Sequence, residues 1–282
     1  MKPAALLLAT LILWGQPPSA RSQDWTRFRG PNGTGISHAK TIPTQWTDQD
    51  FNWKVELPGT GHSSPVVWGD RIFLTSTGDQ EGGIHVLCLG ARDGQVLWRR
   101  DFAFTPFPSH KFNSYAAATP AVDAERVYLV WNQPDHYLLT ALDHHGNQVW
   151  QRDFGPYLTQ HGCGSSPILY EGKIILGNEQ DDKSQDPDDT RRGKSFILAV
   201  QAKTGKTVWQ TPRNSAVVAY STPCVFQSKA GQPQLVFNSQ AHGIYALDPD
   251  TGKLLWEYDK AFDKRSVSSP FAAGDILYGS CG

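Results

Sequence analysis

Three histidines occupy similar places in a repeated sequence pattern, and histidine is a common metal ligand. His62, His110 and His161 each lie in a polar stretch shortly before a motif of two small residues and a proline. Three imidazoles that meet at one site can bind a metal ion. Because these three lie far apart in the sequence, solvated loop histidines are the alternative interpretation, and we assign no metal ligand.

A run of carboxylates in residues 181–189 is a second candidate for metal chemistry. A calcium loop needs alternating aspartates followed by a glycine and a terminal glutamate, and this run lacks that pattern. Arg191, Arg192 and Lys194 follow at once and balance the negative charge. We therefore predict that this insert is a solvated loop.

The glycines of residues 24–35 suggest a phosphate-binding loop, which is a third kind of site. Gly30, Gly33 and Gly35 lie close together, but no strand pattern precedes them and no helix pattern follows. The Lys-Ser or Lys-Thr pair that ends a phosphate-binding loop is also missing. We predict instead that residues 23–50 form an irregular arm whose aromatic residues plug the centre of the fold.

Four hairpin patterns organise the rest of the chain. In each, a glycine precedes a tryptophan by four residues; the pairs are Gly94 and Trp98, Gly146 and Trp150, Gly205 and Trp209, and Gly252 and Trp256. Glycine permits a tight turn with positive φ, and tryptophan on the following strand presents a large apolar surface to a neighbouring unit. We predict that these eight residues have structural roles.

A second motif opens each unit, and the two motifs together predict the fold. Its copies are Ser63-Ser64-Pro65, Ala118-Thr119-Pro120, Ser165-Ser166-Pro167, Ser221-Thr222-Pro223 and Ser268-Ser269-Pro270. An all-β repeat of roughly 40–60 residues is typical of propeller blades. The sequence therefore predicts a β-propeller at residues 51–282, with complete four-stranded blades at about 63–102, 117–154, 165–211 and 221–258 and a partial blade at 268–282.

Residues 51–57 have the pattern of a strand but precede the first complete blade and belong to none of the four. We expect it to pair with the partial C-terminal blade, because propellers commonly close in this way and closure removes exposed sheet edges. That blade would still lack one strand. A fragment of a longer propeller and an irregular five-bladed ring both fit this count.

In a propeller, the loops that precede the first strand of each blade open on one face, around the central channel. Convergent loops of this kind commonly bind partners or ligands. The candidate binding surface at this channel mouth consists of His62, His110, Asn113, Tyr115, His161, Tyr220 and Arg265. The partner would be a protein or a small ligand, and the sequence does not identify it.

Residues 1–22 have the features of a secretory signal peptide. Lys2 gives a positive start, an apolar run follows, and small residues at Ala20 and Ser22 suit cleavage near Ser22. We expect an exported protein in the periplasm or outside the cell, with a retained membrane anchor as the alternative. No other stretch is apolar and long enough to span a bilayer.

Net charge bears on the class of partner, and the cysteine positions bear on metal binding and disulfide pairing. The net charge is −1, which argues against nucleic acid as a partner. Four cysteines, at 88, 163, 224 and 281, form no CxxC motif. Cys88 alternates within a strand pattern and is expected to be buried, while the sequence leaves cysteine pairing open.

The hairpin and Ser/Thr-Pro repeats resemble those of the pyrroloquinoline-quinone (PQQ)-type β-propellers, over residues 24–282. The segment from Asp24 to Gly35 is similar to the start of a secreted bacterial group within that superfamily. The architecture is also similar to the propeller lipoprotein of the outer-membrane assembly machinery. The resemblance implies seven or eight blades, which favours a fragment of a longer propeller.

The resemblance also implies what an enzyme of this type would contain. Its enzymes bind PQQ and calcium above the channel, with adjacent cysteines, an aromatic platform, a Glu/Asn pair for the metal and an aspartate base. This chain has no adjacent cysteine pair, and we assign no catalytic or cofactor-binding residue. We therefore expect a non-catalytic scaffold or ligand-binding module without a cofactor. The alternative is a truncated or degenerate PQQ-dependent oxidoreductase that binds PQQ with calcium.

Overall fold

The computed structural model describes residues 24–40, 42–78, 83–107, 113–183, 188, 191–227 and 231–282. The predicted signal peptide and His110 lie outside these residues. The helical elements of the described chain are the short 3₁₀ turns η1 (Pro31–Gly33), η2 (Asp48–Asp50) and η3 (Asp259–Ala261). No helix in the described residues has the length and apolar character needed to cross a bilayer.

The strands form four antiparallel four-stranded sheets and one two-stranded sheet, each built from consecutive strands. The first sheet contains β1 (Val66–Trp68), β2 (Arg71–Thr77), β3 (Gly83–Gly90) and β4 (Val96–Ala103), and the second contains β5 (Ala121–Val122), β6 (Arg126–Gln133), β7 (His136–Asp143) and β8 (Gln148–Asp153). The third contains β9 (Ile168–Tyr170), β10 (Lys173–Asn178), β11 (Phe196–Gln201) and β12 (Thr207–Pro212). The fourth contains β13 (Cys224–Phe226), β14 (Gln234–Ser239), β15 (Gly243–Leu247) and β16 (Leu254–Tyr258), and the fifth contains β17 (Phe271–Ala273) and β18 (Ile276–Tyr278).

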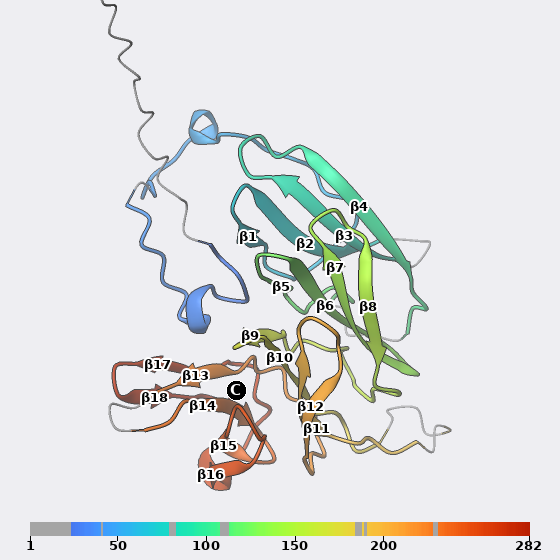
Figure 1. The fold of residues 1–282 in the computed structure, drawn as a ribbon, viewed down its shortest axis with the longest axis vertical. Coiled ribbons are helices and arrows are strands. Elements are labelled where there is room, and N and C mark those ends of the chain that lie inside the picture. The colour runs from blue at the N-terminus through green and yellow to red at the C-terminus, as the bar shows by residue number, and fades with distance from the viewer. Residues whose placement is uncertain are drawn as a thin grey trace, which may run out of the picture.

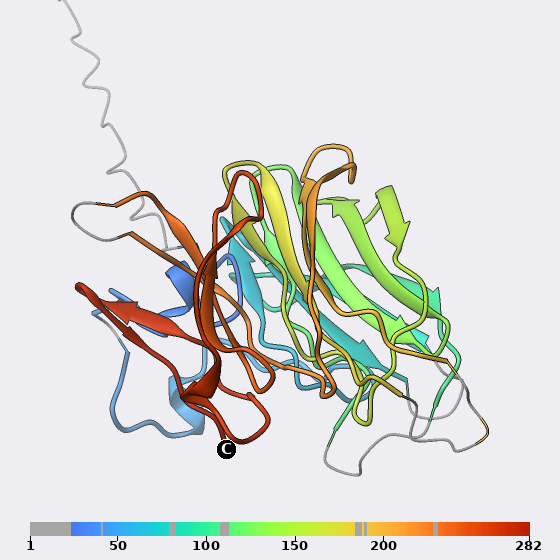
Figure 2. The ribbon, with the colours of Figure 1, turned by 90° about the horizontal axis from the view of Figure 1, so that it is seen from below.

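The sheets follow one another in an arc, with the short first strands toward the inside and β4, β8, β12 and β16 toward the outside (Figure 1). Seen from below, the sheets stand face against face like blades (Figure 2). The prediction of an all-β propeller with four-stranded blades is confirmed.

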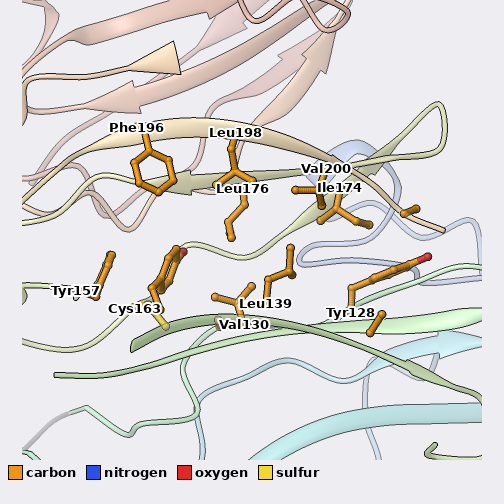
Figure 3. Close-up of a cluster of buried hydrophobic side chains, with 14 of the residues drawn as sticks. Tyr128, Val130, Leu139, Tyr157, Cys163, Ile174, Leu176, Phe196, Leu198 and Val200 are labelled. Carbon is orange, nitrogen blue, oxygen red and sulfur yellow. The ribbon is translucent and has the colours of Figure 1, made fainter. Parts of the chain in front are cut away.

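The middle strands of the four-stranded blades are largely buried, because neighbouring sheets in the arc pack face to face. β3 and β6 are almost wholly buried, whereas the outer strands β4 and β16 are mostly exposed. Figure 3 shows one such interface, in which Val130 and Leu139 of the second blade face Leu176 and Leu198 of the third. The core therefore consists of apolar layers between blades.

Each of the first three blades contacts the next through tryptophan and glycine, whereas Trp256 of the fourth donates to Gln234 within its own blade. The indole Nε1 of Trp98 donates a hydrogen bond to the carbonyl of His144 at 2.8 Å. The same ring lies on Gly146, where a Cβ atom would be 2.9 Å from Trp98 Cδ2. Trp150 on Gly205 and Trp209 on Gly252 repeat this contact. Each of these glycines also has a positive φ, so the turn and the ring contact both require glycine.

The expectation for residues 51–57 was wrong. This segment belongs to no sheet among the described residues, and the partial C-terminal blade consists of β17 and β18 without it. Trp53 nevertheless lies on Gly94 and donates from Nε1 to the carbonyl of Ala91 at 3.1 Å. The segment keeps the tryptophan contact of an outer strand without the backbone ladder.

The Ser/Thr-Pro motifs form a second, inner connection between blades. The amide of Ser64 donates to Thr119 Oγ1 at 2.9 Å, and the amide of Thr119 donates to Ser166 Oγ at 2.9 Å. The pattern continues from Ser166 to Thr222 at 3.1 Å and from Thr222 to Ser269 at 3.0 Å. We call these five residues the hydroxyl belt. It satisfies buried amides near the axis, where the first strands are too short to do so.

Candidate functional site

The loops before the first strands converge on a pocket of about 400 Å³. Its lining comes from the arm and from the loops that lead into all five sheets: Phe28, His62, Asn113, Ala117, His161, Gly164, Ser166, Tyr220 and Val267. This volume lies within the usual range for small-molecule sites. The structure therefore brings together His62, Asn113, His161 and Tyr220, four of the residues expected at the channel mouth.

The arm places Phe28 in this pocket. Trp25 pairs with Val67 of β1 through two backbone hydrogen bonds of 2.9 and 2.8 Å. The side chain of Asn32 makes two hydrogen bonds to the backbone of Val225 in β13, at 2.7 and 2.8 Å. Residues 25–32 thus cross from the first blade to the fourth along the inner strands.

A buried cation strengthens this crossing. Arg27 is fully buried and its Nη2 donates to the carbonyl of Pro223, at the entrance to β13. Burial lowers the pKa of Arg27 to about 10, because the guanidinium has lost most of its hydration. The glycines of the arm serve its turns: Gly30 has a positive φ, and a Cβ there would lie 2.4 Å from the Trp25 ring.

Tyr220 forms an aromatic wall of the pocket. Its ring centroid is 6.2 Å from that of His161, and the Arg265 guanidinium lies 5.9 Å from the Tyr220 centroid. Arg265 Nη1 donates to Gln160 Oε1 at 3.4 Å, and Arg265 itself is absent from the pocket lining. Burial raises the pKa of Tyr220 to about 12, and the phenol is therefore neutral at physiological pH.

The other candidate residues have different surroundings. His62 Nδ1 and Ser114 Oγ are 2.9 Å apart, which orients this exposed imidazole. Tyr115 is absent from the pocket lining: its hydroxyl donates to the carbonyl of Phe107, and its ring packs on Phe104 and Phe107. Tyr115 thus contributes to packing beside the mouth.

The prediction of a solvated loop was wrong for the start of the acidic insert. Asp181 is only 4% exposed, and its Oδ1 accepts a hydrogen bond from the amide of Val218 at 2.8 Å. Burial raises the pKa of this carboxyl, while the Val218 amide and the Arg265 charge favour its ionised form. Asp182, the next residue, is exposed as predicted. Nothing in the local sequence distinguishes the two aspartates.

Comparison with known proteins assigns this chain to a family. Residues 43–221 and 193–279 match the family PQQ_2, described as outer membrane protein assembly factor BamB. A polyvinylalcohol dehydrogenase of Pseudomonas sp is 27% identical over 226 residues, covering 71% of this chain and 33% of that protein. A second polyvinylalcohol dehydrogenase, of Sphingopyxis sp. (strain 113P3), is 23% identical over 259 residues, covering 79% of this chain and 37% of that protein.

A solved structure shares the fold. The quinohemoprotein alcohol dehydrogenase of Comamonas testosteroni gives a TM-score of 0.61 at 18% identity, over 92% of this chain and 46% of that one. The resemblance to PQQ-type propellers is thereby confirmed. The chain spans about a third of the length of the curated relatives that it matches.

These relatives correct the expectation that no cofactor is involved. Both curated relatives are dehydrogenases. A dehydrogenase removes electrons from its substrate, and the common amino-acid side chains provide no group that accepts them, so a cofactor does. The absence of an adjacent cysteine pair was too narrow a basis for excluding one.

The residues around the pocket fit an anionic planar quinone better than a calcium ion. Tyr220 and His161 offer aromatic faces, and His62, Asn113 and Arg265 can donate hydrogen bonds to carboxylates or carbonyls. The described lining contains no carboxylate, which calcium prefers. The described residues also contain no cluster of three or more His, Cys, Asp or Glu suited to a metal. All four cysteines are free thiols, and Cys88 is buried.

Proposed function

The chain belongs to the PQQ_2 family, and we propose that it holds PQQ at the channel mouth of a propeller that oxidises an alcohol. The observation that supports this most is the pocket, because the loops before the four four-stranded blades deliver aromatic and hydrogen-bonding side chains to one place. The two dehydrogenase relatives, which match more than two thirds of the chain, support the same reaction class.

In this proposal each residue has a separate task. The Tyr220 ring would support the planar quinone, and Arg265, whose guanidinium lies 5.9 Å from the centroid of that ring, would bind one of its carboxylates. His62 and Asn113 would donate to the remaining oxygens. When bound, PQQ would supply the oxidising group that takes two electrons from the alcohol carbon.

The substrate proton also needs an acceptor within the pocket. His62 is already assigned to donate to PQQ, so we assign the imidazole of His161, which also lines the pocket, to accept this proton. Phe28 and Val267 add apolar surface to the lining. We propose an alcohol as the substrate class, since both curated relatives are named for one.

A binding titration tests this proposal. PQQ is added to the purified full chain, with and without calcium, and the quenching of tryptophan fluorescence is recorded. We expect saturable binding below about 50 µM, weakened about tenfold by Tyr220→Ala or His161→Ala. Tyr258→Ala and His145→Ala, at exposed positions away from the pocket lining, are matched controls that should leave binding unchanged.

Dye-linked oxidation of small secondary alcohols and of polyvinyl alcohol then tests the reaction class. No PQQ binding at about 100 µM would contradict the proposal. It would favour protein binding instead, the role indicated by the description of the family.

We also propose that residues 1–22 direct export. The apolar run after Lys2 and the small residues at Ala20 and Ser22 support this. Expression in a bacterium, followed by fractionation and N-terminal sequencing, is expected to give a periplasmic protein that begins near Ser22. A cytoplasmic protein that retains Met1 would refute it.

A further inference from the structure

We propose that Asp181 and Gly164 are positioning residues that fix the Tyr220 ring as the ligand platform of the channel-mouth pocket. The sequence alone predicted neither the contact of Asp181 with the Tyr220 segment nor the contact of Gly164 with the Tyr220 ring. The inference deepens the function proposed above and rests on it where ligand affinity is concerned. Its geometric part, the fixing of Tyr220, can be tested without a ligand.

Asp181 lies where three loops meet. Its own amide donates to the carbonyl of Leu158 at 2.9 Å, in the loop before β9. Its carboxylate accepts from the amide of Val218, two residues before Tyr220. The positive charge of Arg265, from the loop before β17, also acts on this carboxylate. Through its backbone amide and its carboxylate, this buried residue thus links the loops that carry His161, Tyr220 and Arg265.

The segment that carries Tyr220 has its backbone held on both sides. The carbonyl of Ala219 accepts from Ser165 Oγ at 2.9 Å, and the amide of Tyr220 donates to the carbonyl of Ser266 at 3.0 Å. Together with the Val218 amide, three successive residues are tied to three different neighbours. Such restraint sets the direction of the Tyr220 Cα–Cβ bond before any ligand arrives.

Gly164 determines where the ring itself can lie. A Cβ atom at Gly164 would be 2.8 Å from Tyr220 Cδ1, which is closer than real Cβ atoms approach. The φ of Gly164 lies outside the left-handed range, so backbone conformation does not require glycine here. The requirement comes from the ring contact alone. Any larger residue at 164 would displace the ring from this position.

Four variants separate these contributions. Asp181→Ala removes the acceptor of the Val218 amide, and Asp181→Asn keeps an acceptor oxygen there while removing the charge. Asp182→Asn is the matched control, because its carboxylate is exposed. Gly164→Ala moves the ring without altering Asp181. Circular dichroism confirms in each case that the blades are folded.

The ligand-independent measurement is hydrogen exchange at the amide of Val218. We expect Asp181→Ala to raise its exchange rate about tenfold or more, since a hydrogen bond to a charged group is lost. Asp181→Asn and Asp182→Asn should stay within about threefold of the unmodified protein. Unchanged protection of Val218 in a folded Asp181→Ala protein would overturn the positioning role.

The ligand measurement uses PQQ as the probe. Asp181→Ala and Gly164→Ala should each weaken PQQ binding about tenfold, while Asp181→Asn restores most of the affinity. If the unmodified protein binds PQQ, and Asp181→Ala and Gly164→Ala bind it as tightly as the unmodified protein does, this inference fails and the proposed function stands. If the unmodified protein does not bind PQQ, the proposed function fails, and the exchange experiment still decides whether Asp181 holds the Tyr220 segment.

Discussion

The indole ring of Trp150 lies so close to Gly205 that a methyl group on the glycine would be 2.8 Å from Cε3 of the ring. The indole Nε1 donates at the same time to the carbonyl of Ala202, at 3.0 Å. One tryptophan therefore contacts the next blade by both ring packing and a directed hydrogen bond. The tight turn at Gly205 is what allows both.

Gly205→Ala should destabilise the fold by about 2–4 kcal/mol, because it adds a ring clash to the strain of a positive φ. Gly155→Ala is the matched control: Gly155 also has a positive φ, of 83°, but open space around it. This control should cost only about 1 kcal/mol. Urea unfolding measures both, and equal effects would contradict a role for the ring contact.

Trp209→Ala should lower the free energy of unfolding by about 3–5 kcal/mol, since it removes a buried aromatic side chain between the third and fourth blades. Val208→Ala, at the exposed neighbouring position, should have little effect. Thermal melting followed by circular dichroism compares them. An unchanged melting temperature for Trp209→Ala would mean that the interblade contact contributes no stability.

Thr222→Val tests the hydroxyl belt. The substitution keeps the shape of the side chain but leaves the buried amide of Ser166 without its acceptor, at a cost of about 1–3 kcal/mol. Thr207→Val on the exposed strand β12 is the control. Chemical denaturation measures the difference, and similar stability of the two variants would show that water replaces the lost acceptor.

Glu179 should make stability depend on pH. Burial raises the pKa of this carboxyl to about 7, because the ionised form is poorly solvated. The groups around it are Tyr245, Ser239, Arg213 and Glu257. The folded protein thus keeps a proton that the unfolded chain releases near pH 4.5. The resulting stabilisation is complete below that pH and is lost as the pH rises through about 7.

The matched variant for this effect is Glu179→Gln, which cannot ionise. Between about pH 4.5 and 7 the unmodified protein should lose about 3 kcal/mol relative to this variant. Melting temperatures recorded across that range provide the comparison. Parallel pH profiles for the two proteins would show that Glu179 ionises normally in the fold.

The structural roles of the repeated glycines and tryptophans were predictable because the same hairpin pattern recurs along the sequence. Trp98 and Gly146 lie in successive copies of one hairpin, so their roles followed once the period was recognised. The convergence of His62, Asn113, His161 and Tyr220 followed from the same topology. In each case the position within the blade determines the position in space.

The features that the sequence did not predict depend on contacts between residues far apart in the chain, and no local sequence pattern marks such contacts. The partner of the Ser166 amide is Thr222, in the next blade, and the motif was recognised without its hydrogen bonds. Asp181 is buried while Asp182 is exposed, because only the former reaches the amide of Val218. Residues 51–57 have the pattern of a strand, but a strand also needs a neighbour, which no local pattern reveals.

The arm runs from β1 to β13 and so connects the first blade directly with the fourth. Its two attachment points, Trp25 on Val67 and Asn32 on Val225, are separated by a fixed number of peptide units. This connection of the first and fourth blades adds to the contacts that run through the blades between them, and the arm carries Phe28 into the pocket. A change in the number of residues between Trp25 and Asn32 would therefore disturb one of these attachments and move Phe28 within the site.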